Sequence, residues 1–144
     1  MALEKKEYYG FPGNHFWPLL YEIFAAKSLP RQLMTYKEKI HLLKTNRVAL
    51  WDVVKSCKRR GASDHWIKEE RPNNILRLVR KQPSLRVIFL NGRTASKLFR
   101  KYFGETIRMT TYDLPSTSPA YASMTYRDKL KKWRFIKKCV GNHG

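Results

Sequence analysis

The segment between residues 85 and 104 constrains the fold of this chain most strongly. It opens with Leu-Arg-Val-Ile-Phe-Leu, an apolar run that predicts a buried strand ended by Asn91-Gly92. A helix is predicted to follow at once, with Gly104 as its C-cap. Its apolar face consists of Ala95, Leu98, Phe99 and Tyr102. A strand that passes directly into a helix is typical of α/β folds, in which helices connect parallel strands.

Apolar residues at helical spacing indicate four further helical segments along the chain. The first has Asn14 as a suitable N-cap and Pro18 in its first turn, where a missing N–H costs little. Its apolar face consists of Phe16, Leu19, Leu20, Ile23 and Phe24. A second helix is predicted over residues 31–44, a third from residue 72, and the last from about residue 123. In the last one, Thr125 and Asp128 fit a capping box, and its apolar stripe consists of Leu130, Trp133 and Ile136.

Two more strands are predicted, at residues 48–51 (Val-Ala-Leu-Trp) and at the β-branched segment 106–111. Residues 53–54 are predicted to open a short helix, and residues 60–61 to form a turn. Because helices and short strands alternate, we expect a three-layer α/β/α sandwich with a short parallel sheet of three to four strands. The whole chain, residues 1–144, is expected to form a single domain.

The charge balance points to a polyanionic partner. The chain carries 30 Lys and Arg residues against 11 Asp and Glu, a formal net charge of +19, yet 42% of its residues are hydrophobic. This combination is normal for a folded domain and predicts binding to nucleic acid, with an anionic membrane surface as the second choice. We expect a monomeric protein of the cytoplasm, associated with the nucleoid if its source is prokaryotic. We expect no membrane association, because no apolar run approaches the roughly 20 residues of a membrane span.

Cysteine and histidine residues give no metal-ligand pattern. Cys57 and Cys139 are far apart and four histidines show no paired spacing, so we expect reduced cysteines, no metal and no cofactor. Phosphate contacts are instead expected from basic residues on the helix after the best strand and on the last helix. The candidates are Arg93, Lys97, Lys129 and Lys132.

Short polar residues follow each predicted strand, where open parallel sheets bind their ligands. They are Asp52, the Asn91-Gly92 pair and the loop 114–119, Leu-Pro-Ser-Thr-Ser-Pro. No Gly-rich phosphate loop, Gly-x-Ser-x-Gly or His-Glu-x-x-His motif is present. The sequence therefore predicts a neutral polar site surrounded by basic and aromatic residues.

Two segments resemble the uracil-DNA glycosylase superfamily. Residues 8–17, Tyr-Tyr-Gly-Phe-Pro-Gly-Asn-His-Phe-Trp, are similar to its Tyr-Tyr…Pro-x-Asn-x-Phe-Trp segment. Residues 114–120, Leu-Pro-Ser-Thr-Ser-Pro-Ala, resemble the second motif of its hypoxanthine-DNA (deoxyinosine) glycosylase branch. Residues 49–53 and 89–92 fit the same pattern, so the resemblance covers about residues 3 to 138. In this superfamily a first strand ends in Gly-x-x-Pro-Gly before the Tyr-Tyr segment. Since Met1 stands where that strand should have ended, we expect a domain truncated at its N-terminus relative to the family.

The resemblance implies a monofunctional DNA glycosylase acting in base-excision repair on double-stranded DNA. Such an enzyme flips a deaminated base out of the duplex and hydrolyses its N-glycosidic bond, without metal or cofactor. Hypoxanthine is the expected base, with uracil and xanthine as other candidates. The open alternative is a degenerate relative that binds nucleic acid without catalysis.

The same resemblance supplies the candidate site residues. Asn14 is the candidate catalytic residue, positioning the water or contacting the base, although an N-cap role alone would also explain it. The candidate base pocket comprises Tyr9, Phe16, Asp52 and Asn91. Tyr9 could instead be an exposed aromatic near the terminus, and Phe16 a core residue. Asp52 could cap a helix, and Asn91 could belong to the turn that ends a strand. The candidate loop for entering the DNA groove and gripping the backbone comprises Pro115, Ser116, Thr117, Ser118 and Pro119, which could instead form a plain Ser-Pro turn.

Overall fold

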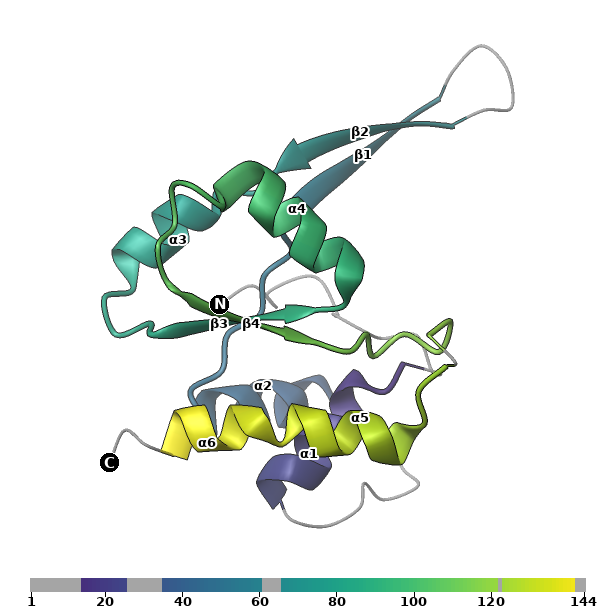
Figure 1. Ribbon diagram of the computed structural model, residues 1–144, viewed down its shortest axis with the longest axis vertical. Coiled ribbons are helices and arrows are strands. Elements are labelled where there is room, and N and C mark those ends of the chain that lie inside the picture. The colour runs from purple at the N-terminus through teal and green to yellow at the C-terminus, as the bar shows by residue number, and fades with distance from the viewer. Residues whose placement is uncertain (1–13, 26–34, 61–65, 122, 142–144) are drawn as a thin grey trace.

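The computed structural model describes residues 14–25, 35–60, 66–121 and 123–141 (Figure 1). Six helices and four strands occur in these ranges. In chain order they are α1 (Phe16–Ala25), α2 (Tyr36–Thr45), β1 (Val54–Arg60), β2 (Trp66–Pro72), α3 (Ile75–Lys81), β3 (Val87–Asn91), α4 (Arg93–Phe103), β4 (Thr110–Leu114), α5 (Tyr126–Trp133) and α6 (Phe135–Gly141).

The centre of the fold is the parallel pair β3 and β4, connected through α4. Their register places Val87 opposite Thr110 and Asn91 opposite Leu114, so both strands end at the same edge. Helices α3 and α4 lie on one face of this pair, and α1, α2, α5 and α6 lie on the other (Figure 1). The predicted α/β class with a parallel sheet between helices is therefore confirmed.

Alternate residues of β3 pack into two cores on the two faces. Leu90 belongs to the core beneath α3 and α4, whose buried members are Ile75, Leu90, Phe99, Phe103 and Ile107. Phe89 packs on the opposite core, which collects the apolar faces of α1, α2, α5 and α6. Leu130, Trp133 and Ile136 are buried there, as their spacing predicts.

Local sequence signals explain where several helices begin. Thr35 and Glu38 form a complete capping box at α2. The Asn74 side chain accepts from the N–H of Arg77 at α3, and the Thr125 side chain accepts from the N–H of Asp128 at α5. These bonds satisfy backbone donors that the first helical turn leaves without intrahelical partners.

The predicted sheet of three to four strands is wrong for the described residues, in which the parallel sheet has two strands. Residues 48–51 do not form the predicted strand, and Trp51 is 42% exposed. The strand expected at residues 106–111 instead begins at Thr110.

The predicted helix at residues 53–54 is also wrong. Val54 begins β1, which pairs antiparallel with β2 and places Val54 opposite Pro72. The turn predicted at residues 60–61 falls partly outside the described residues, and Arg60 is the last residue of β1. This hairpin projects away from the two packed cores (Figure 1). Among the described helices, none is long and apolar enough to cross a bilayer.

Candidate functional site

Polar groups converge where β3 and β4 end. The Nδ2 of Asn91, at the end of β3, donates to the hydroxyl of Thr117 at 3.0 Å, and the N–H of Thr117 donates back to Asn91 Oδ1 at 3.1 Å. The N–H of Gly92 donates to the carbonyl of Leu114 at 2.9 Å, which holds the two strand ends together. Asn91 therefore positions the loop that follows β4, formed by residues 115–120 and called the 115–120 loop below.

The turn before α1 joins this cluster. The N–H of His15 donates to the carbonyl of Thr117 at 2.9 Å, which places Asn14 and His15 beside the 115–120 loop. The Oδ1 of Asn14 accepts from the N–H of Phe16 at 2.9 Å, so Asn14 does serve the start of α1. Within the described part of the chain, no hydrogen bond occupies its Nδ2, which leaves an amide donor at a half-buried position.

Hydrogen bonds within the 115–120 loop and to α5 define its shape. The N–H of Ser118 donates to Ser116 Oγ and the N–H of Ala120 donates to Ser118 Oγ, both at 3.1 Å. From the end of α5, the indole N–H of Trp133 donates to the carbonyl of Pro115 at 2.9 Å. The loop is therefore a bonded turn rather than a flexible connection.

The five loop residues predicted to contact DNA differ in how deeply they are buried. Thr117 is 1% exposed and its hydroxyl is engaged by Asn91, so its contacts hold the loop from inside. Pro119 is exposed, and Pro115, Ser116 and Ser118 are half-buried. These four residues form the accessible part of the turn.

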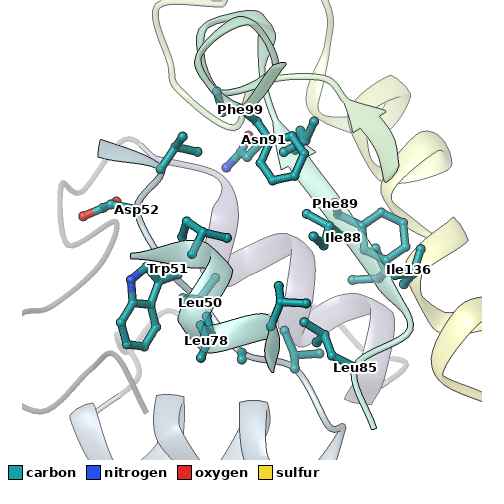
Figure 2. Close-up of a pocket in the computed structure, with 18 of the residues that line it drawn as sticks. Leu50, Trp51, Asp52, Leu78, Leu85, Ile88, Phe89, Asn91, Phe99 and Ile136 are labelled. Atoms are coloured by element: carbon teal, nitrogen blue, oxygen red, sulfur yellow. The ribbon is translucent and has the colours of Figure 1, made fainter. Parts of the chain in front are cut away.

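An apolar cavity of about 280 Å³ lies beside this cluster. It runs along β3 between the segment 47–53 on one side and α3, α4 and α6 on the others, and Figure 2 shows Asn91 and Phe99 at one end with Leu78 and Leu85 at the other. Three predicted pocket residues line it together, namely Phe16, Asp52 and Asn91. Its volume is near the lower end for small-molecule pockets.

These three residues differ in what they can offer a ligand. Phe16 is 3% exposed and stacks edge-on against Trp17 and Trp133, so it is a core residue whose edge reaches the cavity. The backbone carbonyl of Asp52 accepts from Asn73 Nδ2 at 2.8 Å, which anchors the start of the hairpin. Asn91 is the polar residue at the end of the cavity that adjoins the 115–120 loop (Figure 2).

The predicted phosphate contacts separate into exposed and buried cations. Arg93 and Lys97 are exposed on α4, which begins next to the 115–120 loop, and Lys132 is exposed on α5. The prediction for Lys129 is wrong, because its side chain is 0% exposed and its Nζ bonds internal groups. Its place on the face that buries Leu130 and Trp133 was a sequence signal for burial. Tyr9 lies outside the described residues.

The two titratable groups beneath the loop are shifted toward their neutral forms. Burial lowers the pKa of Lys129, and burial together with the charge of Lys129 lowers the pKa of His15. Sequence reasoning did not identify His15 as part of this cluster. Among the described residues, no group of three His, Cys, Asp or Glu side chains could hold a metal ion.

Fold and site together define an α/β protein whose polar side chains gather where its parallel strands end. Residues 2–140 match the family model described as the uracil DNA glycosylase superfamily. The chain therefore belongs to the uracil DNA glycosylase superfamily, which confirms the family indicated by the four motifs.

Individual relatives agree with this assignment. The chain is 37% identical over 138 residues to a protein named hypoxanthine DNA glycosylase from Methanosarcina acetivorans, covering 94% of this chain and 82% of that protein. It is 36% identical over 97 residues to a protein of the same name from Methanosarcina barkeri, covering 67% of this chain and 60% of that protein. The solution NMR structure of a candidate uracil DNA glycosylase from M. acetivorans matches with a TM-score of 0.71 and 33% identity, over 94% of this chain and 80% of that chain.

Proposed function

We propose that this protein is a monofunctional DNA glycosylase that hydrolyses the N-glycosidic bond of a flipped deaminated base, with hypoxanthine as its preferred base. The observation that carries the proposal is the meeting of the Asn14 turn, Asn91 and the 115–120 loop beside one apolar cavity. The relatives named hypoxanthine DNA glycosylase support the choice of base.

The proposed reaction needs only neutral groups. Water adds to C1′ of the deoxyribose as the bond from C1′ to the base nitrogen breaks, and the bonding electrons leave with the base. The proton lost by the water ends on the departing base or in solvent. Because negative charge builds on the base, a fixed amide donor beside it lowers the barrier.

Asn14 is the proposed catalytic residue because its Oδ1 is held by the N–H of Phe16, while its Nδ2 forms no hydrogen bond with the described residues and can donate to a substrate. Asn91 contributes to the base pocket. Its Nδ2 carries a second hydrogen and its Oδ1 a second lone pair beyond those used on Thr117, so it can still present a donor and an acceptor to a base edge.

Contacts to the DNA backbone are assigned to the accessible part of the 115–120 loop and to Arg93, Lys97 and Lys132. Flipping a base costs a few kcal/mol and is easiest at weak or mismatched pairs. A grip on phosphates next to the extruded nucleotide offsets that cost without reading sequence.

The test is single-turnover excision on duplexes that carry one deoxyinosine, deoxyuridine or deoxyxanthosine. We expect deoxyinosine to be cut fastest. Asn14→Ala should slow the chemical step by about 100-fold or more, the usual effect of removing one donor to developing charge, with little change in DNA affinity.

Two further variants separate catalysis from helix capping. Asn74→Ala removes an asparagine side chain that bonds the first turn of α3 and should cost about 1 kcal/mol of stability without slowing excision. Asn14→Asp keeps the capping oxygen and removes the amide donor, so it should fold normally and stay slow. DNA binding without cleavage of any substrate would identify a non-catalytic DNA-binding protein, and full activity of Asn14→Asp would reject the amide role.

A further inference from the structure

A buried lysine lies directly beneath the 115–120 loop. Lys129 projects from the first turn of α5, is 0% exposed, and has its Nζ 3.2 Å from the carbonyl oxygen of Ser118. The same Nζ lies 3.3 Å from Nδ1 of His15 and 5.5 Å from the centre of the Tyr121 ring. One ammonium group therefore contacts the loop, the turn that carries Asn14, and the residue that follows the loop.

Burial of this charge is unfavourable for folding. Among the described residues no carboxylate forms an ion pair with Lys129, and its partners there are a carbonyl, an imidazole and an aromatic ring. An ammonium removed from water without an opposite charge costs stability. A methionine of similar length would fill the same space at no such cost, so packing alone does not account for a lysine here.

The contact with His15 specifies the state of the imidazole. An ammonium group has three donors and no acceptor, so Nδ1 of His15 must accept and carry no proton. His15 is then neutral, with its hydrogen on Nε2. Among the described residues, its other titratable neighbour is Tyr126, whose ring lies edge-on to the imidazole with 5.3 Å between the ring centres. The hydroxyl of Tyr126 donates to Glu22.

We infer that Lys129 is a positioning residue that ties the 115–120 loop to the Asn14–His15 turn and holds His15 neutral in the Nε2–H form. The inference rests on the proposed function in so far as the two segments it joins are the proposed DNA-contacting loop and the proposed catalytic turn. Loss of the ammonium removes the bond to Ser118 and frees Nδ1 of His15, so the two segments are no longer held at one distance.

The test compares Lys129→Met and Lys129→Arg with Lys131→Met, which removes one positive charge from an exposed position on the same helix. Thermal unfolding, ¹⁵N NMR of the His15 ring and single-turnover excision on a deoxyinosine duplex at saturating enzyme are measured for each. For Lys129→Met we expect a melting temperature equal to or above that of the unsubstituted protein, a raised pKa of His15, and about 100-fold slower excision, since small misplacements of a site cost that much. Lys129→Arg should recover part of the rate, and Lys131→Met should change none of the three.

Different results refute different claims. Excision by Lys129→Met within threefold of the unsubstituted rate would overturn the positioning role. A lowered melting temperature of Lys129→Met, together with no recovery of the excision rate in Lys129→Arg, would overturn it as well. If the unsubstituted protein excises no base, the proposed function fails, and the NMR measurement still decides whether Lys129 sets the state of His15. An Nδ1–H form of His15 in the unsubstituted protein would refute the inference on its own.

Discussion

Replacement of Gly92 by alanine should destabilise the protein and move the 115–120 loop. Gly92 joins β3 to α4 with φ of 94° and ψ of 166°, a backbone region that is essentially restricted to glycine. It is buried, and a Cβ at this position would lie 3.0 Å from the Cβ and 3.4 Å from the Cα of Ser116. Alanine at position 92 therefore meets two separate obstacles, one in its own backbone and one in the loop opposite.

The expected magnitude follows from these two obstacles. A residue held in such a backbone region costs about 1 to 3 kcal/mol, and crowding against Ser116 adds to that unless the loop shifts. We expect Gly92→Ala to lower the free energy of unfolding by about 2 kcal/mol or more. At about 2 cal/mol/K of unfolding entropy per residue, this corresponds to a melting temperature lowered by roughly 7 °C.

Variants at Ser116 separate the two costs. Ser116→Gly removes the Cβ that crowds position 92, so the double variant Gly92→Ala/Ser116→Gly should be more stable than the two single effects predict, by about 0.5 kcal/mol or more. Ser116→Ala keeps the Cβ and should give no such recovery. Urea unfolding of the three single variants, of the two double variants that combine Gly92→Ala with either Ser116 substitution, and of the parent protein measures these differences. A loss below 0.5 kcal/mol in Gly92→Ala, or equal recovery by both Ser116 variants, would refute the reasoning.

Three further predictions concern the surroundings of the site. Trp133→Phe leaves the carbonyl of Pro115 without its indole donor and should cost about 1 to 3 kcal/mol in urea unfolding, whereas a cost near zero would show that the bond does not support the loop. Asp113→Asn should cost less than about 1 kcal/mol at pH 7, because the ion pair with Arg100 is exposed. Arg100 holds the pKa of Asp113 below its usual value, so the cost should decline as the pH falls from about 4, and a cost that grows in acid would contradict this sign. Arg93→Ala and Lys97→Ala should each reduce by about 1 the slope of log DNA affinity against log salt concentration, while an unchanged slope would exclude that residue from phosphate contact.

Sequence patterns predicted the elements whose signals are local. The apolar spacing of α1 and α5, a helix soon after residue 72 and the passage from β3 into α4 are all present in the structure. The convergence of Asn91 with the loop after β4 was predicted because parallel strands end at the same edge.

Elements that depend on pairing with a distant segment were not predictable in the same way. Residues 48–51 have the composition of a buried strand, but a strand also needs a neighbour to hydrogen-bond, and among the described residues none pairs with this segment. Strands β1 and β2 show the opposite case. Their sequences, Val-Lys-Ser-Cys-Lys-Arg-Arg and Trp-Ile-Lys-Glu-Glu-Arg-Pro, are too polar to show an apolar alternation, yet the two segments pair along seven positions.

The net charge of +19 treats all cations alike, whereas the fold gives them different roles. Lys129 is enclosed beneath the 115–120 loop, while Arg93 and Lys97 are exposed on α4 beside it. Two contacts join α4 to the strand ends. The N–H of Gly92, directly before α4, donates to the carbonyl of Leu114, and Arg100 forms an ion pair with Asp113. The cations of α4 and the 115–120 loop are thus parts of one bonded unit. If that unit grips DNA as proposed, a substitution that shifts the loop, such as Gly92→Ala, must alter phosphate contact and base excision together, whereas removal of one exposed cation alters DNA affinity alone.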